Sequence, residues 1–174
     1  GNVSLEIVFL PRSTGFVESS LVLHTTAGTF IFQVSGRGTP NPYKLTPFVG
    51  VKVPVGVLYE PSIVLYNPHY EVLSAKEIYT SSGFLHLQLP DEAATFEPTI
   101  YDNTPFGGNN TAQKLRFWDI RPHERQAVIK LRFSSNKTGK FQGFVNIKTN
   151  VANLILQVEV SVVSGAVHKT PEEL

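Results

Sequence analysis

The chain has 174 residues, 41% of them hydrophobic and 17% charged, with a formal net charge of +1 at pH 7. These values are typical of a globular protein, and a charge so near zero argues against a general nucleic-acid binder. The absence of cysteine excludes disulfides, thiolate catalysis and cysteine-ligated metals. No apolar run approaches the ~18 residues of a membrane span. Methionine is also absent, so we expect a fragment, and any signal peptide or membrane anchor would lie outside this sequence.

The first 38 residues predict a meander of three β-strands. Apolar residues alternate with other residues over 3–9, which is the period of a half-buried strand. A second strand is expected over 17–23 and a third over 30–34, with a tight reversal at Ala27-Gly28 between them.

The stretch 36–50 interrupts this pattern. It holds three prolines and three glycines, which suit neither a helix nor a central strand. We therefore predict a connector over 39–50, with the domain boundary near Thr39.

The remaining chain predicts a complete β domain over 51–165 and a polar tail over 166–174. Pro54 and Gly56 place the first strand at a sheet edge. A long loop is predicted over 91–114, where proline, glycine and asparagine accumulate. Strands are expected over 51–58, 63–66, 72–79, 84–89, 117–120, 128–133, 141–148 and 154–162. Short strands at regular spacing indicate a sandwich or a barrel.

The first meander recurs without gaps 124 positions later. Phe9 falls on Phe133, and Thr14-Gly15 falls on Thr138-Gly139. Two meanders can agree partly through shared alternation, but a Thr-Gly turn in identical register favours a tandem repeat. We therefore predict an all-β chain: one complete β-sandwich domain, preceded by the last three strands of a related domain that lacks its opening strands here.

Three strands alone would expose the inner face that a second sheet should cover. Residues 1–38 are therefore expected to dock on the complete domain, to associate with a second copy through strand pairing, or to be poorly ordered.

The sequence offers little catalytic chemistry. Its five histidines are scattered without metal-ligand spacing, and no HExxH or GxSxG pattern occurs. The Gly-x-Gly start at Gly36 lacks the third glycine and the helix of a dinucleotide loop. We expect no enzyme, metal, cofactor or small-molecule substrate, and no nucleic-acid partner.

Basic residues concentrate in the second half of the chain, and they have two interpretations. They could be the solvated outer faces of strands, or they could form a partner-binding face around Trp118 with Arg116, Arg121 and Arg125. Trp118 itself is expected to belong mainly to the core.

The predicted edge strand is a second candidate contact. Val51, Val53 and Val55 could take part in the addition of a partner strand, in which the main chain gives affinity and alternate side chains give specificity. Pro54 could equally serve to block such pairing.

Three sequons, at Asn2, Asn109 and Asn136, are candidate N-glycosylation sites. Two of them fall in predicted loops, where a glycan can be accommodated. They favour a lumenal or extracellular location.

A longer set of motifs resembles the transmembrane protein 131 family. It extends over most of the chain and includes Pro40-Asn41-Pro42-Tyr43-Lys44-Leu45, Pro47-Phe48-Val49-Gly50, Val53-Pro54-Val55, Leu65-Tyr66-Asn67-Pro68-His69, Leu85-His86-Leu87-Gln88-Leu89-Pro90, Trp118-Asp119-Ile120-Arg121-Pro122 and Ile147-Lys148-Thr149-Asn150. The loop over 91–114 matches least.

This resemblance implies immunoglobulin-like sandwiches similar to the pilus chaperone PapD. It implies a lumenal ectodomain of a single-pass membrane protein of the endoplasmic reticulum and secretory pathway, which binds procollagen to promote its assembly and secretion. A structural spacer in a tandem β array, or a regulator of Wnt signalling in a related branch, are the alternatives. The family carries no individual contact residue over to this chain.

Overall fold

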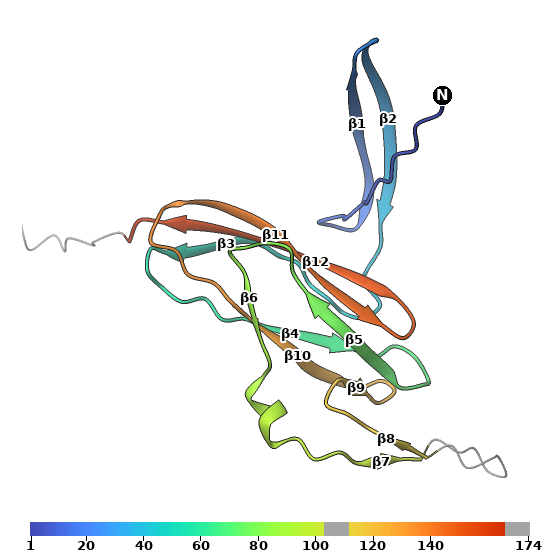
Figure 1. Cartoon of the computed structure of the whole chain (residues 1–174), viewed down its shortest axis with the longest axis vertical. Coiled ribbons are helices and arrows are strands. Elements are labelled where there is room, and N and C mark those ends of the chain that lie inside the picture. Colours follow the sequence, from blue (N-terminus) through green and yellow to red (C-terminus); the bar gives the residue numbers. More distant parts are fainter. Residues whose placement is uncertain (103–111, 166–174) are drawn as a thin grey trace, which may run out of the picture. The chain divides into compact units, whose positions relative to one another are not determined.

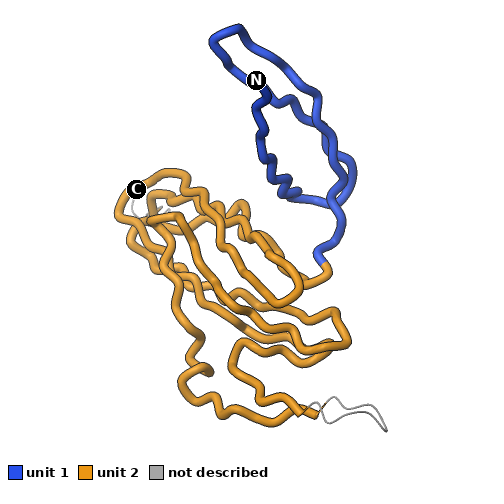
Figure 2. Tube along the Cα trace, turned by 45° about the vertical axis from the view of Figure 1, so that its right-hand side comes forward, with its two compact units in different colours: residues 1–41 blue, residues 42–174 orange. Residues whose placement is uncertain are grey.

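In this computed structural model residues 1–102 and 112–165 are described. The chain forms two compact units, Gly1–Asn41 (unit 1) and Pro42–Leu174 (unit 2), coloured separately in Figure 2. The described residues are almost entirely β, and their one helical segment is the five-residue 3-10 helix η1 (Asp91–Thr95). The all-β prediction is confirmed.

Unit 1 is an antiparallel hairpin of β1 (Gly15–Thr25) and β2 (Gly28–Gly38), shown in Figure 1. The predicted strand over 3–9 is wrong, because these residues form no strand. They still pack on the hairpin: a Cβ added at Gly36 would lie 3.0 Å from the Phe9 ring. Large apolar side chains remain exposed on the hairpin, including Phe16 at 68% and Ile31 at 66%.

The β1–β2 hairpin has the same register as the hairpin of β11 (Gly139–Thr149) and β12 (Asn153–Val163) in unit 2. Gly15 pairs with Gly38, and the residues 124 positions later, Gly139 and Val162, pair in the same way. The agreement continues to His24 with Thr29, and Lys148 with Asn153. This identical register supports the repeat.

The repeat also explains the missing strand. Residues 3–9 correspond to 127–133, most of which lie in β10 (Arg125–Arg132). In unit 2, β10 is hydrogen-bonded between β4 (Ser62–Tyr66) and β6 (His86–Gln88). The described part of unit 1 has no strands that correspond to β4 and β6. An alternating sequence without a partner strand has no ladder to join. The assignment of residues 1–38 to a preceding sandwich domain stays a prediction.

Unit 2 is a sandwich of two sheets (Figure 1). One sheet has the order β3-β12-β11-β5-β9, where β3 is Phe48–Pro54, β5 is Leu73–Tyr79 and β9 is Asp119–Ile120. The other has the order β4-β10-β6. The edge position predicted for the first strand is confirmed, and this strand runs parallel to β12.

The inner faces of both sheets form one apolar core. Fully buried members include Leu65, Leu73, Val128, Val145 and Val160. Two side chains from the predicted connector also belong to it, because Tyr43 and Leu45 are each 8% exposed. The predicted connector over 39–50 therefore extends too far, because residues 42–50 are part of unit 2.

The predicted loop over 91–114 contains more structure than its composition suggests. Besides η1, it holds β7 (Ile100–Tyr101) and β8 (Gln113–Lys114), which pair antiparallel. Asn109 and the predicted polar tail over 166–174 lie outside the described residues. Across residues 1–102 and 112–165, no helix has the length and hydropathy to cross a membrane.

Candidate protein-binding cleft beside Trp118

A short turn positions Trp118 at the edge of the larger sheet. The Asp119 amide donates to the Arg116 carbonyl at 3.1 Å, and the Arg116 amide donates to the Asp119 carboxylate at 2.7 Å. β9 follows and pairs with Leu73 and Ser74 of β5. The Trp118 carbonyl in turn accepts the Ala75 amide at 3.0 Å. Hydrogen bonds on both sides therefore fix the tryptophan backbone.

The indole of Trp118 is half-buried and packs against the core. Its Nε1–H donates to the Val128 carbonyl at 2.8 Å, which satisfies the polar end of the ring. Trp118 therefore packs against the core but is not one of its buried members. The same residue also lines a surface cleft.

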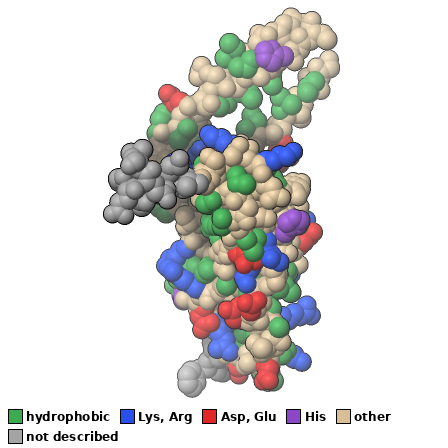
Figure 3. All heavy atoms as spheres, turned by 90° about the vertical axis from the view of Figure 1, so that its left-hand side faces the viewer, with side chains coloured by type: hydrophobic (Ala, Val, Ile, Leu, Met, Phe, Trp, Pro, Cys, Tyr) green, Lys and Arg blue, Asp and Glu red, His purple; other side chains and the backbone are tan. Residues whose placement is uncertain are grey.

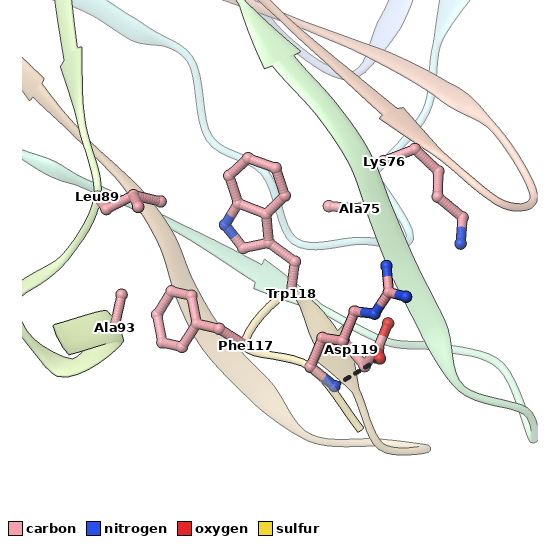
Figure 4. Close-up of a pocket in the computed structure, with 8 residues that line it drawn as sticks. Ala75, Lys76, Leu89, Ala93, Phe117, Trp118 and Asp119 are labelled. Carbon is pink, nitrogen blue, oxygen red and sulfur yellow. Dashed lines mark hydrogen bonds between the residues drawn. The ribbon is translucent and has the colours of Figure 1, made fainter. Parts of the chain in front are cut away.

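This cleft has a volume of about 390 Å³. In Figure 4 the Phe117 ring lies between Ala93 of η1 and the indole of Trp118. Phe117 is held by an edge contact with the Phe96 ring at 5.6 Å and by the side-chain amide of Gln126, whose Nε2 donates to the Phe117 main-chain carbonyl. The apolar lining consists of Ala75, Leu89, Ala93, Phe117 and Trp118.

The rim of the cleft carries two cations, Lys76 and Arg116, and one carboxylate, Asp119. Lys76 and Arg116 line it, both are exposed, and among the described residues neither has an ion-pair partner. The Asp119 carboxylate is occupied by the Arg116 amide. The nearby Glu77 carboxylate contacts Lys148 Nζ at 3.1 Å, and this hydrogen bond raises the pKa of Lys148. With Glu77 paired to Lys148, the charged groups that line the cleft are two cations and one carboxylate, which gives it a net charge of +1.

The cleft adjoins an unpaired stretch of sheet edge. β9 pairs only with Leu73 and Ser74, so within the described chain residues 76–79 of β5 have no strand on that side. Such an edge can hydrogen-bond an extended segment of another chain.

The structure does not gather all the predicted basic residues here. Arg121 lies over the Tyr101 ring at 5.4 Å, and Arg125 lies 6.0 Å from the centroid of the Tyr66 ring. Neither lines the cleft. On the face of unit 2 shown in Figure 3, basic and acidic side chains are interspersed. Four residues were predicted for this face, Trp118 and three arginines. Of these, only Arg116 and Trp118 line the cleft.

The edge strand β3 presents a poorer binding surface than its sequence suggested. Val53 is 4% exposed, so its side chain belongs to the core. The Val55 amide donates to the Val163 carbonyl at 3.0 Å, and by strand alternation the main chain of Lys52 and Pro54 faces the free edge. Pro54 has no N–H to offer there. This arrangement supports the blocking interpretation of the proline.

Sequence reasoning missed Lys76, Leu89, Ala93 and Phe117. The sequence did offer a way to find Phe117. It precedes Trp118 at the start of a predicted strand, and two adjacent aromatic side chains there cannot both enter the core. The other three come from distant segments and carry no local signal.

The comparisons with known proteins agree with this fold. A family model described as the transmembrane protein 131 second Ig-like domain matches residues 42–148, which lie within unit 2. The chain belongs to the transmembrane protein 131 family. Transmembrane protein 131 of Mus musculus is 40% identical over 95% of this chain and 8% of its own length. The Transmembrane protein 131 homolog of Drosophila melanogaster is 34% identical over 92% of this chain and 9% of its own length. The chain thus spans less than a tenth of these relatives.

The family match is to an Ig-like domain and not to an enzyme. A solved family 123 glycoside hydrolase from Clostridium perfringens is 10% identical, with a TM-score of 0.34 over 66% of this chain and 23% of its own. A likeness this weak supports no inference. In the described ranges no group of three or more histidine or carboxylate side chains is arranged to hold a metal.

Proposed function

We propose that unit 2 is a protein-binding module in the lumenal ectodomain of a transmembrane protein 131 family member, and that its client is procollagen. Membership of the family supports the ectodomain assignment, and the family resemblance supports the client. The location is the lumen of the endoplasmic reticulum and secretory pathway, and binding serves procollagen assembly and secretion.

The cleft beside Trp118 is the observation that carries protein binding. It combines a preformed apolar lining, two rim cations and an open β5 edge. Interface hot spots favour aromatic and arginine side chains around a pocket that excludes water. A pocket held rigid before binding also reduces the entropic cost of association.

A pull-down with procollagen carboxy-terminal regions tests this proposal. Leu89→Glu places a charge in the cleft at a residue that is 52% exposed, so it should fold and should weaken binding at least ~10-fold. Val151→Glu, at a residue 55% exposed in the β11–β12 turn, is the matched control and should bind normally. If the folded wild-type chain retains no procollagen, the client assignment fails. If Leu89→Glu binds normally, the cleft is not the contact.

A structural spacer is the second candidate. The identical register of the two hairpins favours a tandem array whose domains position other parts of a longer chain. This role predicts that neither substitution changes the binding of procollagen by the full-length protein. Strand-mediated self-association through residues 1–38 also stays a prediction, which the exposed Phe16 and Ile31 of unit 1 support.

The lumenal location predicts glycosylation at Asn136. This residue is exposed in the turn between β10 and β11, where the Ser135 hydroxyl and the Lys137 main chain hydrogen-bond to each other. A chain secreted from animal cells should therefore lose mass on treatment with an N-glycosidase. Asn136→Gln should remove one glycan, and Asn2→Gln tests the exposed N-terminal sequon in the same way. An unmodified Asn136 in secreted protein would contradict this prediction and leave the fold untouched.

A further inference from the structure

The cleft beside Trp118 also has a chemical selectivity. We infer that it takes an extended peptide segment in which one large apolar side chain is flanked by acidic residues. This inference rests on the proposed function, because the site is the same, and it names the chemistry of the client that the site would recognise.

The apolar part of the ligand follows from the lining. A volume of about 390 Å³ lies near the lower end of the ~300–1,000 Å³ of small-ligand pockets, which suits one large side chain with its adjoining main chain. Phe117 is fixed by Phe96 and Gln126, and Trp118 is fixed by Val128. Two immobilised aromatic side chains favour a phenylalanine or leucine side chain over a polar one.

The acidic part follows from the rim. Lys76 and Arg116 both line the cleft with no ion-pair partner among the described residues, and they outnumber the one lining carboxylate, that of Asp119, which accepts the Arg116 main-chain amide. A carboxylate on either side of the buried side chain would meet one of these cations. A basic segment would instead meet like charges, which disfavours binding.

The extended conformation follows from the sheet edge. Residues 76–79 of β5 have no strand on the side of β9, and this edge begins at Lys76, which lines the cleft beside Ala75. A segment added along it satisfies main-chain groups while one side chain enters the cleft. Pro54 reduces this option at the opposite edge, on β3, so the β5 edge is the better acceptor.

Trp118 is the only tryptophan of the chain, so its fluorescence reports on this site directly. The probe is the peptide acetyl-Glu-Asp-Phe-Asp-Glu-amide, titrated into the full chain. We expect a saturable change in emission and an affinity that falls as salt rises. The same peptide with alanine at its centre, and one with lysine in place of each acidic residue, should bind at least ~10-fold more weakly.

Charge reversals locate the binding. Arg116→Glu and Lys76→Glu should each weaken the acidic peptide by at least ~5-fold. Lys140→Glu makes the same change of net charge at an exposed position of β11 outside the cleft, and it should leave the affinity unchanged. Circular dichroism of each variant confirms folding.

The outcomes separate this inference from the proposed function. Equal binding of the acidic and lysine peptides, or an equal loss in Lys140→Glu and Arg116→Glu, overturns the inference. The inference is also overturned if a folded chain retains procollagen but binds no acidic peptide. Selective binding of the acidic peptide by a chain that retains no procollagen supports the inference and overturns only the client assignment.

Discussion

Phe133→Ala should lower the free energy of unfolding of unit 2 by about 3–5 kcal/mol, the usual cost of deleting a buried phenylalanine ring. Phe133 is 1% exposed and lies 5.7 Å from the Phe84 ring and 5.2 Å from the Phe141 ring. Its main chain exchanges two hydrogen bonds with Tyr59, which the substitution keeps. The loss should therefore come from the cavity and from the missing ring contacts, and urea unfolding followed by Trp118 fluorescence measures it.

Two control variants show that the position, and not the residue type, determines this effect. Phe144→Ala removes a ring from β11 in the other sheet, but that ring is 42% exposed, so a loss below ~1 kcal/mol is expected. Phe9 is the repeat counterpart of Phe133 and is 47% exposed, so Phe9→Ala should not change the unfolding of unit 2. A loss below ~1.5 kcal/mol for Phe133→Ala would show that the three rings do not form a tightly packed cluster.

The repeat shows where sequence patterns are sufficient and where they are not. The segments 3–9 and 127–133 have similar alternation, yet only the second forms a strand, because only it has neighbours to pair with. A strand needs a partner strand, and an alternating sequence shows only which side chains prefer the core and which prefer water. The strands of unit 2 could be predicted because their partners lie within the same unit.

The prolines and glycines of the sequence led us to predict the start of unit 2 too late in the chain. Prolines and glycines made 39–50 look like a connector, but Tyr43 and Leu45 are buried and β3 begins at Phe48. Lys44 between them is exposed and has a φ of 54°. Proline and glycine mark a break in regular structure and do not say whether the chain leaves the domain.

The candidate cleft was predictable only in part. Trp118 and Arg116 were identified because they are close in sequence to other basic residues, and the same reasoning named Arg121 and Arg125, which do not line the cleft. Lys76 and Leu89 belong to the site only because β5 and the segment before η1 meet there. A surface site built from distant segments is a property of the fold, and one sequence does not show it.

Asn67→Ala should destabilise unit 2 by about 2–4 kcal/mol, because it removes several hydrogen bonds and leaves buried groups without partners. Asn67 has 0% exposure. Its Nδ2 donates to the Glu71 carbonyl at 2.8 Å and to the Ile120 carbonyl at 2.9 Å, while Oδ1 accepts the His69 amide at 2.9 Å. One side chain thus joins the turn after β4 to the end of β9.

A second asparagine supplies the control. The Asn150 side chain accepts from the Ser74 amide at 2.9 Å and donates to the Val72 carbonyl at 3.1 Å, but the residue is exposed. The exposed position of Asn150 should let water reach these two groups, although Ser74 and Val72 are themselves buried, so Asn150→Ala should cost about 1–2 kcal/mol, less than Asn67→Ala. Equal losses in the two alanine variants would mean that burial does not set the cost.

Asn67→Asp separates hydrogen bonding from packing, since it keeps the volume and the acceptor but loses both donated bonds. The introduced carboxylate would face the Glu71 and Ile120 carbonyls in a buried site, so its pKa in the folded state should be raised. A folded-state pKa above the unfolded one means that the folded protein binds the proton more tightly, so the variant should gain stability as pH falls. Urea unfolding at two pH values tests this, and a pH-independent loss would show that the carboxylate reaches water.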